Sequence, residues 1–319
     1  MKNTKKVWLI ATILVLIGTV IFLCSMSAIN WNFNKLSTVE YQTNTHEINK
    51  DFNNITISTD TANITFVLVN DSKCKVECYE NEKAKHEVNV ENDTLIIKVD
   101  NQRSWYDYIG FNFTSPKITL YLTKNEYTTL SINASTGNVK IPNNYSFENA
   151  DVSLTTGDVT FNASVSKLLK IKTNTGSVNI ENNSINLLDL MVNTGTITIS
   201  KVIFENDLTI NILTGNAYLS DINCKNLKLS GNTGNVNLDG VIANNHLSIE
   251  RTTGNVKFSK CDASDIFIKT TTGDIKGSLL SSKIFIANSN TGNVDVPKTT
   301  IGGRCEANTN TGNIKIEIN

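Results

Sequence analysis

Residues 130–141 have the sequence LSINASTGNVKI, in which apolar and polar side chains alternate on both sides of a Thr-Gly dipeptide. The dipeptide occurs ten times, and successive copies lie 19 or 20 residues apart. Their glycines are Gly137, Gly157, Gly176, Gly195, Gly215, Gly234, Gly254, Gly273, Gly292 and Gly312. A short, fixed period of this kind is typical of repeat proteins, in which each copy is one structural unit.

Four positions of the repeat are apolar or small in nearly every copy. They lie seven and five residues before the glycine and two and four residues after it, as Leu130, Ile132, Val139 and Ile141 do in the first copy. This alternation predicts a strand, a corner and a second strand with one face turned inward. A unit of 19–20 residues is too short to bury that face alone, so the copies must stack. The sequence predicts an all-β protein whose residues 130–319 form a ten-turn parallel β-solenoid.

The corner residues are explained by folding. Glycine permits the left-handed backbone of a tight corner, and the Asn or Asp that follows most of the glycines tolerates such corners well. By the two-residue alternation, the threonine before the glycine should point inward, so we expect its hydroxyl to form hydrogen bonds with backbone groups of the corner. An ice-binding plane is disfavoured because the outward positions mix Lys, Asp, Asn and Ser. Calcium-binding corners are disfavoured because only Asp158 and Asp274 place an Asp directly after the glycine.

Three residues of the repeat depart from their columns. Cys261 and Cys305 stand where other copies have aliphatic residues, so we expect buried thiols. Arg251 lies three residues before Gly254, in a column that is otherwise small or apolar, and the sequence offers no physical account of it.

The N-terminus predicts a membrane anchor over residues 1–29. Lys2, Lys5 and Lys6 precede an uncharged run at 7–29, which as a helix would be ~34 Å long and could span a bilayer. The positive-inside rule then places the N-terminus in the cytoplasm and the repeats outside the cell. A cleaved signal peptide is the alternative interpretation, because residues 25 and 27 are small. Lipidation of Cys24 is disfavoured by Leu23 before it.

The segment between the anchor and the repeats divides in two. Residues 30–47 predict a polar linker, and residues 48–129 predict a β segment that caps the solenoid. Strands are expected at 52–58, 63–69, 75–79, 87–92, 94–99 and 117–123, and residues 59–64, TDTANI, resemble a degenerate corner. The loop at 105–111, WYDYIGF, is rich in aromatic residues. It either packs over the cap or contacts a partner or the bilayer through Trp105, Tyr106, Tyr108 and Phe111.

The chain ends in a strand at 314–319 without a capping sequence. A tenth rung of this kind would leave its backbone groups unpaired. We therefore expect an open end at which Ile314, Ile316 and Ile318 contact a second copy or another envelope protein by strand addition. The alternative is that Lys315 and Glu317 discourage such pairing.

No constellation of residues predicts an enzyme. His46, His86 and His246 have no recognised catalytic or metal-binding spacing, and no nucleophile elbow, P-loop or zinc signature is present. The six cysteines suggest no disulfide framework. A metal site of Cys74, Cys78 and His86 is a weaker alternative to buried or hydrogen-bonded thiols. The net charge of −1 gives no reason to expect nucleic acid. We predict no catalytic residue, no cofactor and no metal.

The repeat pattern L-x-I-x-x-x-T-G-x-V-x-I follows Phe52, Ile55, Ile57 and the segment VNVENDTLII at 88–97. Together these resemble the bacterial putative-adhesin β-strand-repeat family, a cell-envelope domain of unknown function, over roughly residues 50–319. One departure is Leu122-Thr123, where many members have Leu-Pro. The resemblance implies a β-solenoid at the bacterial surface and no site residues. It is compatible with an adhesin-like module that contacts a glycan, a protein or another cell, or with an envelope-stress or structural protein.

Overall fold

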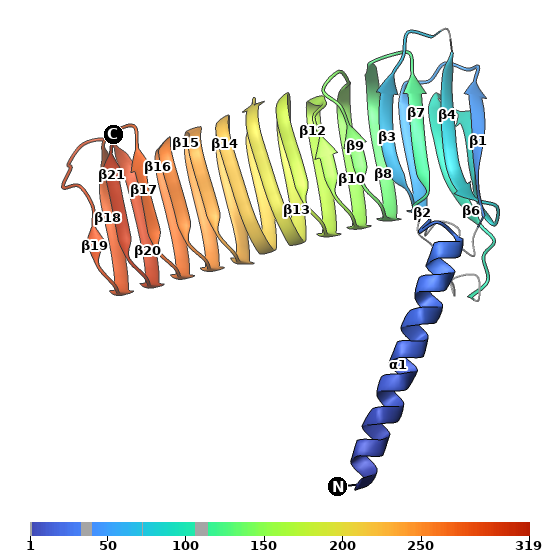
Figure 1. Ribbon diagram of the computed structural model, residues 1–319. Coiled ribbons are helices and arrows are strands. Elements are labelled where there is room, and N and C mark those ends of the chain that lie inside the picture. Colours follow the sequence, from blue (N-terminus) through green and yellow to red (C-terminus); the bar gives the residue numbers. More distant parts are fainter. Residues whose placement is uncertain (1, 33–39, 72, 106–113) are drawn as a thin grey trace.

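The protein is a long parallel β-solenoid preceded by one apolar helix, which confirms the predicted fold class (Figure 1). The computed structural model describes residues 2–32, 40–71, 73–105 and 114–319. The elements are α1 (Lys2–Ala28), β1 (Tyr41–Ile48), β2 (Asn54–Thr61), β3 (Asn63–Leu68), β4 (Cys74–Asn81), β5 (Ala84–Glu91), β6 (Thr94–Asn101), β7 (Lys117–Leu122), β8 (Glu126–Thr136), β9 (Val139–Ile141), β10 (Ser146–Thr156), β11 (Val159–Phe161), β12 (Ser164–Thr175), β13 (Val178–Phe204), β14 (Asp207–Thr233), β15 (Val236–Thr253), β16 (Val256–Thr272), β17 (Ile275–Leu279), β18 (Lys283–Thr291), β19 (Val294–Asp295), β20 (Gly303–Thr311) and β21 (Ile314–Ile318).

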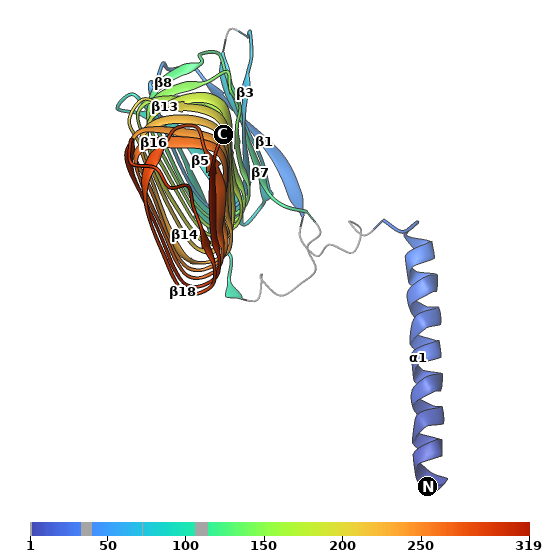
Figure 2. The same cartoon turned by 90° about the vertical axis from the view of Figure 1, so that its left-hand side faces the viewer.

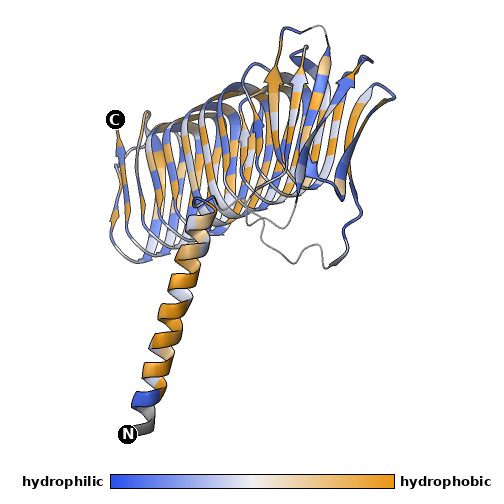
Figure 3. Cartoon of the chain, turned by 45° about the vertical axis from the view of Figure 1, so that its right-hand side comes forward, coloured by the Kyte–Doolittle hydropathy of each residue, from blue (hydrophilic) through white to orange (hydrophobic). Residues whose placement is uncertain are grey.

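Each rung consists of a strand before the Thr-Gly corner and a strand after it, and equivalent residues of successive rungs face each other. Leu130 pairs with Ala150, and Ile132 with Val152, in the parallel ladder of β8 and β10. The inward residues form one continuous core along the rod. Figure 2 shows the rungs stacked as superposed loops, and Figure 3 shows hydrophilic and hydrophobic residues alternating along the strands. The predicted apolar columns are therefore the core.

The corner glycines are required by both conformation and space. Gly234, for example, has a φ of +123°, and a Cβ there would lie 2.0 Å from the carbonyl oxygen of Gly215 in the preceding rung. The same near-contact with the neighbouring corner recurs at the other nine glycines. A side chain is excluded because the rungs approach one another through their corner backbones.

The structure corrects the predicted roles of the other corner residues. The side chain of the Asn or Asp after the glycine accepts a hydrogen bond from the backbone N–H of the equivalent residue in the next rung. Asn255 accepts from Asp274 at 2.8 Å, and Asp274 from Asn313 at 2.7 Å. All ten threonines of the dipeptide are exposed. One of them, Thr291, donates to the carbonyl of Asn310 at 3.1 Å as expected, but the hydroxyls that reach the carbonyls of the corner glycines belong to residues two positions earlier, as when buried Thr270 donates to the carbonyl of Gly254 at 3.1 Å.

Arg251 is buried, and its side chain crosses the rung below. Its Nη1 donates to the carbonyl of Ile212 at 2.8 Å, Nη2 to that of Gly215 at 3.1 Å, and Nε to that of Gly234 at 3.2 Å. The residue paired with Arg251 is Gly231, where a Cβ would lie 2.2 Å from Nη1. The missing side chain at Gly231 is therefore what makes room for the guanidinium.

The solenoid begins before the first Thr-Gly. β2 and β3 form a rung whose corner is Thr61-Ala62, and Thr61 pairs with Thr136. β6 and β7 add a parallel layer beyond it, and antiparallel β5, β4 and β1 complete this end. Because β1 begins at Tyr41, the predicted linker at 30–47 extends too far.

The last rung of the sequence is not the last rung in space. β20 lies between β16 and β18, and β21 lies between β17 and β19. The ninth rung therefore lies two levels beyond the eighth, and the tenth rung lies between them. Ile314 and Ile316 are buried by this insertion, at 1% and 2% exposure. The prediction of an open tenth rung is wrong at Ile314, which is paired on both sides, whereas β21 pairs with β17 alone from Ile316 to Ile318, and a partner contact there stays a prediction.

Candidate functional site

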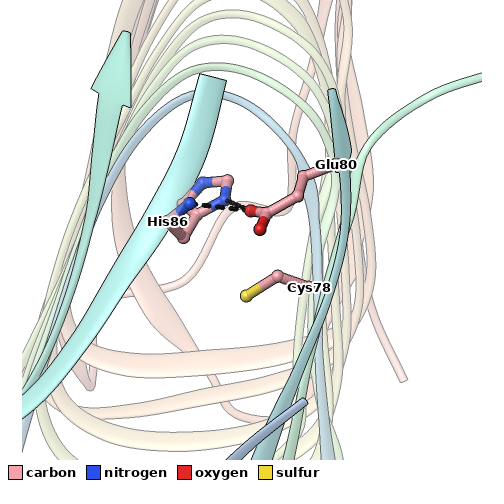
Figure 4. A group of neighbouring side chains, drawn as sticks. All are labelled: Cys78, Glu80 and His86. Atoms are coloured by element: carbon pink, nitrogen blue, oxygen red, sulfur yellow. Dashed lines mark hydrogen bonds and ion pairs between the residues drawn. The ribbon is translucent and has the colours of Figure 1, made fainter. Parts of the chain in front are cut away.

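A buried polar cluster, which we call the cap cluster, joins the two faces of the rod near its N-terminal end. It consists of Asn44 on β1, Thr59 on β2, Cys78 and Glu80 on β4, and His86 on β5. β4 belongs to the face that contains β7 and β3, whereas β5 belongs to the face that contains β6 and β2. Side chains from opposite walls therefore meet inside the cap (Figure 4).

Glu80 is the centre of the cap cluster. Its Oε2 accepts hydrogen bonds from the backbone N–H of His86 at 2.7 Å and lies 2.6 Å from the ring Nδ1. Its Oε1 accepts from the Asn44 amide at 2.6 Å. The other ring nitrogen, Nε2, lies 2.8 Å from the Thr59 hydroxyl. Every donor and acceptor of the carboxylate and the imidazole therefore has a partner within the cluster.

The electrostatics favour an ionised Glu80. Burial by itself raises the pKa of this carboxyl, but the hydrogen bonds from His86 and Asn44 outweigh it, and the pKa is lowered from its ordinary value. Cys78 shows the opposite balance, because burial raises the pKa of its thiol to about 12. Cys78 is therefore a protonated thiol at neutral pH, beside a hydrogen-bonded Glu80–His86 pair.

The cap cluster contains a possible set of metal donors. Cys78, Glu80 and His86 each offer a donor atom, and the three atoms lie within 4.8 Å of one another. The arrangement fits a metal poorly, since a metal would have to break the hydrogen bonds of the pair and deprotonate a thiol whose pKa is raised. The cluster is better described as a set of buried hydrogen bonds that hold the two walls of the cap together.

The sequence identified only two members of the cap cluster. Cys78 and His86 come together as in the weaker metal-site alternative, but Cys74 does not join them, and its Sγ lies 3.3 Å from the Thr123 hydroxyl. Glu80 was missed because the expected strand ended at residue 79, whereas β4 continues to Asn81. The two-residue alternation Cys78, Glu80 along that strand is the signal that could have found it. All six cysteines are free.

A hollow of about 530 Å³ crosses several rungs next to the cap. We call it the serine groove. Its outward residues form two columns, one of Glu126, Ser146, Ser164 and Ser184 and one of Thr128, Glu148 and Ser166, with Asn53 and Glu205 at the ends. Tyr127, Phe147 and Val165 lie between the columns. The ladder slips in register between Phe147 and Asn149, and the hollow lies against this bulge.

The predicted aromatic contact residues fall mainly outside the described residues, because Tyr106, Tyr108 and Phe111 lie in the segment 106–113. Trp105 is described, and its side chain is 77% exposed. The role of these four residues stays a prediction.

Among the described residues, α1 is the one helix that is long and apolar enough to cross a membrane. The span at Lys5–Ala28 has a mean hydropathy of 2.8, and none of its apolar window is buried against the rest of the protein. A membrane anchor and a signal sequence both fit these properties.

Comparison with known proteins identifies a family for most of the chain. The family model described as Toastrack DUF4097 matches residues 52–211 and 195–319. A crystal structure of a putative adhesin from Parabacteroides distasonis is 14% identical, with a TM-score of 0.45, and the match covers 76% of this chain and 97% of that one. For a putative adhesin from Bacteroides fragilis the values are 15%, 0.41, 87% and 97%. Comparison with curated proteins found no match.

Proposed function

This chain belongs to the Toastrack DUF4097 family, and from that premise we propose that it is a non-catalytic, adhesin-like binding module displayed outside the membrane. The proposal has three parts, which concern the anchor, the lack of a reaction site and the surface that binds. Each part rests on different residues and can fail separately.

The distribution of charge around α1 supports display outside the cell. Lys2, Lys5 and Lys6 precede the apolar span, and no Lys or Arg follows it before Lys35. Positive charge at the N-terminal side keeps that side in the cytoplasm. The exposed apolar surface of α1 requires a nonaqueous environment, which a bilayer provides.

The lack of catalysis is supported by the state of the buried titratable groups. Glu80 and His86 form a buried acid–imidazole pair, with 1% and 4% exposure, and are saturated by hydrogen bonds. A general acid or base must reach a proton of its substrate. The pair has no such access, so it stabilises the cap.

The serine groove is the main structural support for the proposed binding function. Its hydroxyls and carboxylates repeat from rung to rung, at the ~4.8 Å spacing of hydrogen-bonded strands. An extended ligand that is itself rich in hydroxyls could exchange hydrogen bonds with several rungs at once. The groove therefore fits a glycan chain, for which Ser, Thr and Asn act as donors and acceptors and Glu126 as an acceptor.

Display and binding can be tested on intact cells that express the full chain. Protease added from outside should remove the solenoid, whereas a cytoplasmic marker survives. Labelled cell-wall polysaccharide should bind these cells about tenfold more strongly than cells without the protein, a difference of about 1.4 kcal/mol. A double substitution, Ser146→Tyr with Ser164→Tyr, fills the groove and should abolish the gain.

The matched control is Ser153→Tyr, which adds the same side chain on β10 outside the groove. Binding that survives the groove substitutions, or that the control abolishes equally, would reject the groove. A solenoid that is protected from external protease would reject display. Altered membrane-stress signalling on deletion of the gene, without any defect in binding, would favour the envelope-regulatory alternative.

A further inference from the structure

The ninth rung closes the far end of the rod, and its core residues are only partly covered. We call residues 283–302 the terminal rung; it contains β18 and β19. Among the described residues, β18 pairs with β20 and β19 with β21, and neither has a partner on its other side. Val294 is 44% exposed, although Ile314, its partner in the next rung, is 1% exposed. The terminal rung therefore exposes the end of the hydrophobic core and a row of unpaired backbone groups.

Apolar side chains surround this opening. Ile284 and Ile286 of β18 are 45% and 47% exposed, and Leu280 and Ile301 in the adjoining loops are 48% and 69% exposed. Phe285 and Ala287 are only partly buried against the core, whereas their partners Cys305 and Ala307 are fully buried. Contiguous exposed apolar surface of this kind on a soluble domain marks an interaction site.

The exposed part of β18 lacks the usual protection of an edge strand. Residues 284–294, IFIANSNTGNV, contain no charge and no proline, whereas Asp295, Pro297 and Lys298 follow in the same rung. At the opposite end the outermost strands are β1 and β5, and β5 has Lys85, Glu87 and Glu91 on its edge. Charged residues discourage the pairing of an edge with another chain. The β18 edge thus differs from the β5 edge and is the part of the far end that can accept a further strand.

We propose that the terminal rung binds the terminal rung of a second copy of this chain, in an end-to-end dimer. The partner must satisfy a strand edge and cover a core with the cross-section of a rung, and another terminal rung does both. The β5 edge of a second copy is excluded as the main partner because its charges discourage pairing. A contact between identical ends is two-fold symmetric, so the assembly stops at the dimer.

The size of the end is sufficient for such a contact. β18 has nine residues and is therefore ~30 Å long at ~3.3 Å per residue, and the two β layers with their outward side chains span ~20 Å. The footprint is ~600 Å² per copy, or ~1,200 Å² in total. Stable interfaces begin at about this area.

The test measures self-association of the full chain in density-matched detergent by analytical ultracentrifugation. Wild type should form dimers as its concentration rises. Ile286→Lys places a charge on the exposed face of β18 and should weaken the dimer at least about tenfold. The matched control is Ile203→Lys, which changes an isoleucine that is 58% exposed in the middle of the rod and should leave the dimer unchanged.

Hydrogen exchange gives a second measurement that does not depend on a variant. Amides of β18 should become protected on dimerisation, whereas those of β5 should not change. A wild type that stays monomeric at all concentrations would overturn the proposal. So would a dimer that Ile286→Lys leaves intact, because α1 or another surface would then hold the copies together.

Discussion

Replacing Arg251 by methionine removes three hydrogen bonds that connect three rungs at one point. The guanidinium donates to the carbonyls of Ile212, Gly215 and Gly234. A hydrogen bond from a charged donor contributes about 1.5–3 kcal/mol, and each carbonyl left without a partner costs about 1–3 kcal/mol. Burial of the charge opposes this by several kcal/mol and lowers the pKa of Arg251. We therefore expect Arg251→Met to reduce the free energy of unfolding by about 2–4 kcal/mol.

The assay is urea unfolding of the full chain in detergent, followed by far-ultraviolet circular dichroism. Because repeat proteins can unfold in sections, hydrogen exchange of β14 and β15 should be measured as well. Arg304→Met is the control, because the Arg304 side chain is 59% exposed and pairs at the surface with Glu306. Its expected effect is about 0–1 kcal/mol. Equal effects of the two substitutions would refute the role assigned to Arg251.

Three further substitutions test other parts of the fold. Gly234→Ala should lower the melting temperature by several degrees, because the new Cβ meets the Gly215 carbonyl, whereas Gly240→Asn should be tolerated, because φ there is +62° and the nearest atom lies 3.2 Å away. Glu80→Gln should cost about 1–3 kcal/mol at pH 7 in urea unfolding, because the hydrogen bonds of a buried carboxylate with His86 and Asn44 are weakened or lost. Since the pKa of Glu80 is lowered by folding, its contribution is complete above the unfolded value near 4.5 and is lost as the pH falls through the lower folded value, so wild type and variant should converge in acid. Asn255→Ala should cost about 1 kcal/mol in the same assay, because the N–H of Asp274 loses its acceptor.

The solenoid could be predicted because its determinant is local and repeated. Leu130 and Ile132 face inward for the same reason in every rung, and the Thr-Gly period sets where each rung turns. The hydrogen bonds of the corner threonine and asparagine were only partly predicted because they depend on the neighbouring rung. Strict alternation would turn Thr136 inward, but β8 ends there and the corner backbone turns the side chain out.

The cap cluster was only partly predictable because its members are far apart in the sequence. Asn44 lies 36 residues from Glu80, and Thr59 lies 27 residues from His86. No repeat connects these segments, so the pairing of β1 with β4 and of β5 with β6 could not be read from a period. Only the tertiary structure brings the two walls together at Glu80.

The order of the ninth and tenth rungs could not be predicted from the sequence either, because rungs of nearly identical pattern can stack in either order. One ion pair connects the rungs in the observed order. Lys283 of the ninth rung is buried and reaches Asp262 of the eighth at 2.6 Å, across the level of the tenth. The residue paired with Lys283 at that level is Gly303, where a Cβ would lie 1.7 Å from the carbonyl oxygen of Ser264.

Arg251 likewise reaches across a rung, since its side chain passes Gly231 to a carbonyl two rungs away. At Gly231 the missing side chain makes room for the guanidinium, whereas at Gly303 it allows the close approach of the Ser264 carbonyl. A buried ammonium without a partner is costly, so the contact between Lys283 and Asp262 stabilises the stack in which the tenth rung lies between the eighth and the ninth. That order leaves the terminal rung, not the C-terminus, as the open end of the rod.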